Sequence, residues 1–337
     1  RPRTIVDPRR EMPSMAADVD ASMLYNAITV AEQQGRTREL FSLYRDMLAS
    51  DGHAQSEFGK RKLAVLNEPL LVQAFDKKSP PDVKAAAEVE AAIVDAEDLI
   101  RGWTHALDSS LYPVSVVEKV FAVRNGKFVL QRLIPVPHTL LDFTTGKLMI
   151  LDGMDPENTA KAMPADPDHF IIHRGNLSTL PDQWGGPMRS ILFWWLLSTC
   201  NRGWWGRFME KYGAPFVVGK YDAQDDASRD VLERAFRIAT RLGGLVVTKE
   251  TEIELKEASA KDTGDAYQTF HDVANREKSK IIIGQTLSAE ARALGIGGTG
   301  AAATQEEVRA DIRRFDALSL SMTIRRNLFT QICRING

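Results

Sequence analysis

The segment Gly295–Gly300 has the spacing of the dinucleotide-binding motif G-x-G-x-x-G. In that motif the glycines let the backbone approach a pyrophosphate, which lies at the N-terminus of the following helix. Asp316 stands near the distance at which an acidic residue would bind a ribose hydroxyl. The motif also requires a buried strand directly before it, whereas residues 287–294 favour a helix. We therefore expect a flexible glycine loop that comprises Gly295, Ile296, Gly297, Gly298, Thr299 and Gly300.

The histidines do not have the spacing of a metal site. His169 and His173 are four residues apart, which would place both on one face of a helix. Residues 170–172 between them are strand-like, however, and residues four apart in a strand are separated by about 13 Å. The remaining histidines are scattered singly, with no acidic residue at ligand spacing: His53, His105, His138 and His271. The sequence thus predicts no metal and no cofactor.

Neither covalent catalysis nor paired-carboxylate chemistry is indicated. The chain contains no G-x-S-x-G motif, and its two cysteines, Cys200 and Cys333, lie within predicted helices and not at helix N-termini. The acidic pairs at 225–226 and 306–307 stand at helix starts, where they complement the helix dipole. We expect the protein not to be an enzyme.

Six aromatic residues crowd into 16 residues of one predicted helix: Phe193, Trp194, Trp195, Trp204, Trp205 and Phe208. Such rings can stack on the bases of a single-stranded nucleic acid. Adjacent rings point to different sides of a helix, however. We therefore favour a second interpretation, in which one ring of each pair packs inward and the other meets a neighbouring subunit.

The charges are nearly balanced, with 43 Lys and Arg against 45 Asp and Glu and a net charge of −2. A protein that holds nucleic acid tightly through phosphates needs a basic excess. Arg276, Lys278 and Lys280 lie late in one predicted helix and are interleaved with acidic residues, as are four arginines of the last helix. Mixed runs of this kind are typical of solvated or subunit-bridging faces. Any polyanion must therefore be held loosely or locally.

The length of 337 residues and the composition of the whole chain indicate a globular protein of two packed units. The first ten residues, with four arginines and two prolines, favour an extended arm. A helix is expected from Thr37 until Asp51-Gly52 ends it. We expect two strands joined by a turn at Leu63–Phe75, and one long helix from Pro80 to about Leu107.

From Val114 to Ile172 the pattern becomes strand-like, with Asn125-Gly126 suited to a tight hairpin and Thr145-Gly146 to a second one. Residues up to about 180 are therefore predicted to form an α+β unit with a mainly antiparallel sheet. Residues 181–187 contain two prolines and two glycines and supply the expected domain boundary.

The C-terminal half predicts long helices around a small insert. Helices are expected at about 188–212 and 263–283 and from about 302 through 332. The insert carries strands at 216–221, 245–248 and 252–256 and a helix at 228–242. The stripe expected to face the core of the last helix comprises Val308, Ile312, Phe315, Leu318 and Met322. The longest apolar run, 191–197, is flanked by polar residues and is too short to cross a membrane.

Several stretches resemble the portal proteins of Mu-like bacteriophages. They are His173-Arg174, Trp184-Gly185-Gly186-Pro187-Met188-Arg189, Trp194-Trp195, Trp204, Phe208 to Pro215, Gly219-Lys220-Tyr221, Ser279 to Ser288, the glycine loop and the helix at Glu306-Glu307-Val308. The match is ordered along roughly residues 40 to 333 and is most specific from 169 onward.

The resemblance implies a homo-oligomeric ring, typically a dodecamer, at one vertex of the capsid. The ring would carry double-stranded DNA during packaging and ejection and dock the terminase large subunit and a head–tail adaptor, in contact with major capsid and scaffold proteins. It implies assembly in the host cytoplasm, a place in the virion, and no membrane partner. The candidate channel-facing residues are Arg276, Lys278 and Lys280.

By the same resemblance, the chain divides into named parts of a portal. They are an N-terminal arm at 1–36, a wing at 37–186, stem helices at 187–213 and 259–284, a clip at 214–258, a tunnel loop at 285–303 and a long helix at 304–337, with the family's C-terminal crown not among these residues. Two alternatives stay open. One is an oligomeric adaptor that does not contact DNA, and the other is a nucleotide- or metal-using enzyme.

Overall fold

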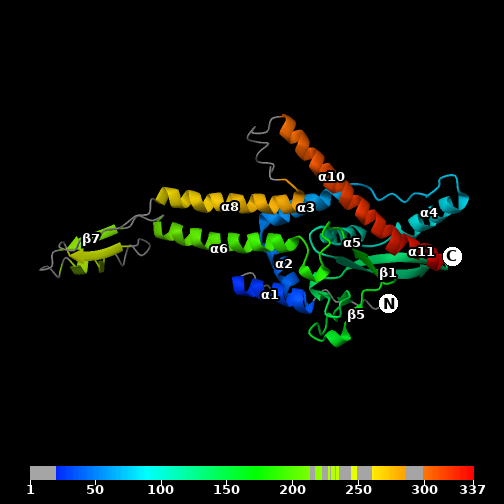
Figure 1. The fold of residues 1–337 in the computed structure, drawn as a ribbon, viewed down its shortest axis with the longest axis horizontal. Helices are drawn as coiled ribbons and strands as arrows, with labels where there is room; N and C mark the ends of the chain where they lie inside the picture. The colour runs from blue at the N-terminus through cyan, green and yellow to red at the C-terminus, as the bar shows by residue number, and fades with distance from the viewer. Residues whose placement is uncertain are drawn as a thin grey trace. The chain divides into compact units, whose positions relative to one another are not determined.

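The computed structural model describes residues 20–212, 217–221, 244–248, 260–285 and 299–337, with a few helical positions between 227 and 234. The chain forms two compact units: unit 1 comprises residues 1–195 and 275–337, and unit 2 comprises residues 196–274. Two long helices, α6 (Met188–Tyr212) and α8 (Ala260–Ile283), each belong partly to both units (Figure 1). The division thus falls inside these helices, whereas the sequence placed a boundary just before α6.

Unit 1 begins with three helices, α1 (Ala21–Gln34), α2 (Arg38–Ser50) and α3 (Gly52–Leu66). Helix α2 matches the prediction. Helix α1 lies within the segment 1–36 assigned to the arm, of which only the first ten residues were expected to be extended, and those lie outside the described residues. The strand expected from Leu63 was wrong, because Leu63 begins the last turn of α3. Phe58 and Val65, seven residues apart, both face the core, so the helical period continues through the segment interpreted as a strand. No strand follows at 67–75.

The single helix predicted after Pro80 is two helices, α4 (Pro80–Ile93) and α5 (Leu99–Ala106). The backbone of Glu97 between them pairs with strand β2 (Lys127–Pro135), donating to the carbonyl of Gln131 at 2.8 Å. Asp98 then takes a left-handed conformation with φ of 58°. Pairing with the sheet therefore ends the helix at a place where the helix propensity of the residues alone would have continued it.

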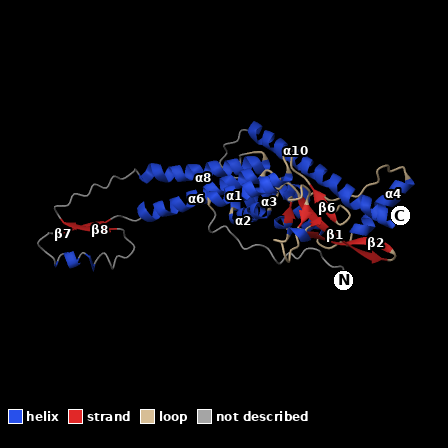
Figure 2. Cartoon of the chain, turned by 60° about the horizontal axis from the view of Figure 1, so that its bottom comes forward, coloured by secondary structure: helices blue, strands red, loops and turns tan. Residues whose placement is uncertain are grey.

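The main sheet has the antiparallel order β2-β1-β6, with β1 at Ser115–Arg124 and β6 at Phe170–His173. Asn125 and Gly126 both have positive φ, 54° and 75°, as the predicted tight hairpin requires. A small second sheet joins β3 (Leu141–Asp142), β4 (Met149–Ile150) and β5 (Met163–Pro164). Figure 2 shows strands and helices together in this unit, which confirms the α+β class.

Helix α10 (Thr299–Ile324) continues through a π-helical turn, Arg325–Phe329, into α11 (Thr330–Asn336). Its buried apolar residues are Leu320, Ile324, Leu328 and Ile332, which pack with Val117, Leu133 and Ile171 of the main sheet. The predicted stripe was wrong, because Phe315, Leu318 and Met322 are exposed while Val308 and Ile312 are partly buried. The helix carries two apolar faces, and packing on the sheet selects between them.

Within unit 2, α6 and α8 contact each other directly. The side-chain amide of Asn201 donates to the carbonyl of Tyr267 at 3.1 Å, and the rings of Phe208 and Tyr267 lie 5.7 Å apart. Strands β7 (Val217–Tyr221) and β8 (Gly244–Thr248) form a parallel pair at the positions predicted for two strands of the insert. The third predicted strand, at 252–256, lies outside the described residues.

Among the residues that the structure describes, no helix combines the length and the apolar character that crossing a membrane requires.

Candidate functional site

The start of α6 is fixed by close backbone packing. Gly185 and Gly186 lead into the helix with φ of 88° and 65°. A Cβ on Gly185 would stand 2.2 Å from the hydroxyl oxygen of Tyr44, so this position excludes every larger residue. Met188 and Trp195, seven residues apart, are buried. The first two turns of α6 are therefore part of the core of unit 1.

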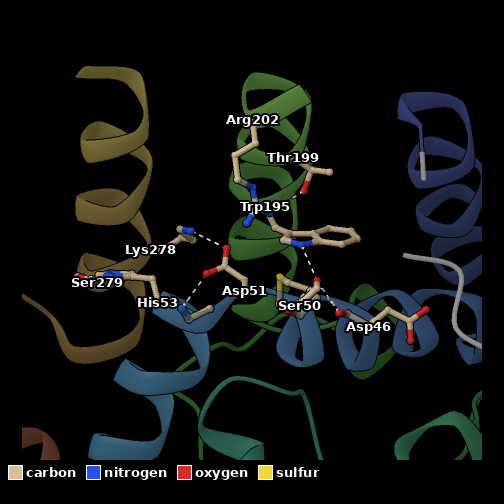
Figure 3. Close-up of polar contacts among 11 residues, drawn as sticks. Asp46, Ser50, Asp51, His53, Trp195, Thr199, Arg202, Lys278 and Ser279 are labelled. Carbon is tan, nitrogen blue, oxygen red and sulfur yellow. Dashed lines mark hydrogen bonds and ion pairs between the residues drawn. The ribbon is translucent and has the colours of Figure 1, made fainter. Parts of the chain in front are cut away.

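Trp195 also has a polar partner on α2. Its indole Nε1 donates to Oγ of Ser50 at 3.0 Å, and only 1% of the residue is exposed (Figure 3). A buried indole N–H that lacked a partner would cost about 1–3 kcal/mol. The hydrogen bond therefore selects the orientation of the ring as well as its burial.

The end of α8 is attached to the same region by a buried ion pair. Nζ of Lys278 lies 2.6 Å from Oδ2 of Asp51, and the two side chains are 2% and 5% exposed (Figure 3). Oδ1 of Asp51 accepts the backbone N–H of Ala54 at 3.0 Å and caps α3. Both carboxylate oxygens are therefore used, one for the cation and one for the helix N-terminus.

His53 and Ser279 extend this contact by one hydrogen bond of 2.7 Å. Burial lowers the pKa of His53, and the ammonium of Lys278 lowers it further, against the opposing charges of Glu57 and Asp51. The imidazole is therefore neutral at pH 7. We call Asp51, His53, Lys278 and Ser279 the α8 anchor.

Arg61 joins three elements of unit 1 through one guanidinium. Its Nε and Nη2 bind the two oxygens of buried Asp316 at 2.7 and 2.9 Å, and Nη1 donates to the carbonyl of Ile282 at 2.8 Å. Asp316, which the nucleotide interpretation would have placed at a ribose, is thus committed to an ion pair. Arg61 also satisfies a carbonyl in the last turn of α8, before Gly284 ends the helix with φ of 69°.

Lys119 of β1 holds the π-helical turn against the sheet. Its ammonium donates to the carbonyl oxygens of Pro167 at 2.6 Å and Asn327 at 2.5 Å, and it also bonds the side chain of Gln331. Burial lowers the pKa of Lys119 to about 8. A π-turn leaves carbonyl groups displaced from the regular helical pattern, and here Lys119 uses one of them.

The three residues predicted from the sequence to face a channel differ in how exposed they are in the structure. Arg276 and Lys280 are exposed on α8, and Lys280 pairs with Glu277 at 2.5 Å. Lys278 is buried in the α8 anchor, so the expectation that it faces a channel was wrong. Its position could have been found from the sequence, because Ala274 and Ile282, four residues before and after it, share its buried face.

The glycine loop lies outside the described residues except for Thr299 and Gly300, which form the start of α10.

The structure agrees with some of the expectations for the histidines and not with others. His173 is buried, with Nδ1 2.9 Å from the hydroxyl of Thr323, and it makes no pair with exposed His169. His105 and His138, by contrast, are not isolated, because Asp108 lies three residues after His105 and close to both. The expectation that no acidic residue stands at ligand spacing from His105 was therefore wrong.

Comparison with known proteins identifies the class. The family model described as the portal protein of Mu bacteriophage matches residues 41–337, and the chain belongs to this family. A curated relative, the portal protein of Escherichia phage Mu, is 24% identical over 306 residues. The alignment covers 87% of this chain and 56% of the relative, so the chain spans about half the length of that protein.

Proposed function

We propose that copies of this chain form a ring at one vertex of a phage capsid and that double-stranded DNA passes through its centre. Membership of the portal family supports this proposal, because that family is structural and not enzymatic. The observation that carries it is the surface of α6, where Phe193, Trp204 and Met209 are each more than half exposed in the isolated chain. Exposed large apolar side chains along one helix support a contact with another protein where they gather into a patch.

The parts of the chain take the following roles in the proposal. Residues 37–186 form the wing, the helices at 187–213 and 259–284 form the stem, and the insert at 214–258 forms the clip that docks the terminase large subunit and later the head–tail adaptor. The segment 285–303 forms the tunnel loop, and α10 begins within its last residues, at Thr299. The ring is a dodecamer that assembles in the host cytoplasm with scaffold and major capsid proteins.

The charge of the chain fits a passage better than a tight binding site. Each phosphate that a cation neutralises adds a salt-dependent term to DNA affinity, so a lining of unpaired arginines would hold the duplex in place. The exposed cations on the described part of α8 are interleaved with acidic residues, and Lys280 already pairs with Glu277. We therefore assign to Arg276 and Lys280 loose, sequence-independent contacts with DNA.

Light scattering after size-exclusion chromatography tests the assembly. We expect a single species with the mass of about a dozen copies. Trp204→Glu should shift the protein toward monomer while leaving the helical circular dichroism unchanged, because the exposed ring contributes to contacts between copies. Asp272→Lys, also on an exposed position of the long helices, is the matched control. A wild-type protein that stays monomeric under all assembly conditions contradicts the proposal.

Two further variants test the assigned parts. Deletion of Gly295–Thr304 should leave the ring assembled and reduce DNA retention in particles, whereas a deletion product that does not assemble would show that the loop is structural.

Charge reversal within 222–250 should weaken binding of the motor or adaptor without unfolding the subunit. Unchanged binding would contradict the placement of the clip.

A further inference from the structure

Three side chains that can bind a metal converge near the C-terminal end of the helix α5. His105 is in the last turn of α5, Asp108 is in the 3-10 helix η1 (Leu107–Ser110) that follows, and His138 begins the 3-10 helix η2 (His138–Leu140). One potential ligand atom from each residue lies within 4.8 Å of the other two. We call these three residues the His–Asp cluster. Two imidazoles and one carboxylate are the donor types found in catalytic and other open zinc sites.

One nitrogen of the His–Asp cluster has no hydrogen-bond partner among the described residues. Nδ1 of His105 stands 3.3 Å from Oδ2 of Asp108, but its Nε2 is buried and has no hydrogen-bond partner among the described residues. Nε2 of His138 is 3.0 Å from the hydroxyl oxygen of Ser115. A buried imidazole nitrogen without a partner carries a desolvation cost, so a rotation of His105 that gives Nε2 a ligand would be favourable.

The surroundings hold the cluster in place. The ring of His138 stacks on Tyr112 with centroids 3.8 Å apart, and Phe41 meets it edge-on at 6.3 Å. The bond between His138 and Ser115 also leaves Nδ1 of the same ring for a different contact. A metal-binding histidine commonly has its second nitrogen fixed by a partner in this manner.

Burial and neighbouring charges set the ionisation of Asp108 and His138. Burial opposes the ionisation of Asp108, but its hydrogen bond with His105 and the ammonium of Lys62 outweigh that cost and lower its pKa to about 2. Burial, followed by the charge of His105, lowers the pKa of His138 well below the usual value of 6.5. At neutral pH the carboxylate is therefore charged and His138 is neutral.

We propose that His105, Asp108 and His138 bind one divalent transition-metal ion, with Zn²⁺ the best match to this donor set. Three protein ligands leave a fourth tetrahedral position for water. Zn²⁺ takes nitrogen at about 2.0–2.1 Å, so the ligand atoms must move closer together than they lie here. His105 and Asp108 are the ligands that would rotate, and their side chains, 14% and 18% exposed, give the ion a route of entry.

The position of Lys62 determines which carboxylate oxygen of Asp108 is available to a metal. Its ammonium lies 2.7 Å from Oδ1 of Asp108, so the metal would bind through Oδ2, the oxygen that faces His105. The positive charge of Lys62 opposes a second cation nearby. Removal of this charge should therefore tighten metal binding, whereas a cluster with a purely structural role would show no metal response at all.

The test uses the full chain stripped with a chelator and titrated with Co²⁺ as a spectroscopic probe and with Zn²⁺ in calorimetry. We expect one ion per chain, the visible absorption of four-coordinate Co²⁺, and a raised melting temperature. His105→Gln should weaken binding at least about 100-fold, and Ser115→Ala, which removes an outer partner, by about 10-fold. Lys62→Met should strengthen binding. The matched control is His169→Gln, which changes an exposed histidine elsewhere.

Absence of stoichiometric binding to the wild-type chain would overturn the proposal, and so would equal binding by His105→Gln and the wild type. Circular dichroism establishes that each variant is folded. If His105→Gln fails to fold, Lys62→Met decides the question: affinity that is unchanged or weaker places the ion outside the cluster. The readout is ion binding by single chains, so it is independent of whether the chain forms a ring.

Discussion

Two of the Lys–Asp pairs in unit 1, Lys278–Asp51 and Lys62–Asp108, have nearly the same separation and different surroundings. Lys278 and Asp51 lie 2.6 Å apart and are almost fully buried, and both oxygens of Asp51 are bonded. Lys62 and Asp108 lie 2.7 Å apart, each nearly a fifth exposed, next to a histidine with an unpartnered nitrogen. The presence of a charge pair therefore does not show what the pair does. A pair whose hydrogen-bonding groups all have partners stabilises the fold, whereas a pair beside a group without a partner can still take up a ligand.

The largest expected effect on stability comes from breaking the buried pair of Lys278 and Asp51. Asp51→Ala leaves the ammonium of Lys278 buried without its counter-ion, which costs about 3–5 kcal/mol. It also removes the N-cap of α3, worth about 1 kcal/mol. Urea unfolding followed by circular dichroism measures the change in the free energy of unfolding.

The matched control is Asp272→Ala on an exposed position of α8, which should change stability by less than about 0.5 kcal/mol. The double variant Asp51→Leu with Lys278→Met should recover most of the loss, because no charge is then left buried. If Asp51→Ala lowers the free energy of unfolding by less than about 1 kcal/mol, the α8 anchor does not stabilise the fold in the way proposed.

The second prediction uses pH, because each pair has a histidine with a lowered pKa beside it. In the folded chain His138 stays neutral well below pH 6.5, while in the unfolded chain it binds a proton near that pH. Stability must therefore fall as the pH drops below 6.5, with a slope of up to about 1.4 kcal/mol per pH unit from this one group.

The two histidines should differ in this experiment. In the presence of chelator, His138→Asn should remove more of the acid-dependent slope than His53→Asn, because His53 is less completely buried and its pKa is lowered less. Unfolding midpoints in urea at several pH values between 4 and 7.5 give the slopes. Equal slopes in both variants would remove the distinction between the two regions.

The smallest expected effect comes from the partly exposed pair. Without metal, Lys62→Met should cost about 1 kcal/mol, since Asp108 keeps access to water and to His105. The same substitution should raise the pKa of Asp108 from about 2, because the ammonium is one of the groups that lower it. NMR titration of the carboxyl group checks the direction. A loss as large as that of Asp51→Ala would mean that both pairs are equally structural.

The sequence predicted the elements whose signals are local. The helix at 188–212 is preceded by two glycines and a proline, and the hairpin at 125–126 is set by Asn-Gly, so both were predicted with accurate bounds. The break between α4 and α5 was not predictable in this way, because it depends on Glu97 pairing with a strand more than thirty residues later. Contacts of that range leave no mark on local periodicity.

The candidate site was predictable to a smaller degree. The burial of Lys278 follows from the period of Ala274 and Ile282, but its counter-ion lies 227 residues away in the chain. The His–Asp cluster has the same difficulty, since only the spacing of His105 and Asp108 is local and His138 arrives through the fold of unit 1. Side chains brought together by tertiary structure require the structure to be recognised.

The central claim is that copies of this chain close into a ring around a passage for DNA. Averaged end-on electron micrographs of the purified full chain test it most directly. The proposal predicts a closed annulus with an open centre wide enough for a duplex. Particles that never close, or a centre filled by folded protein in mature virions, would contradict it.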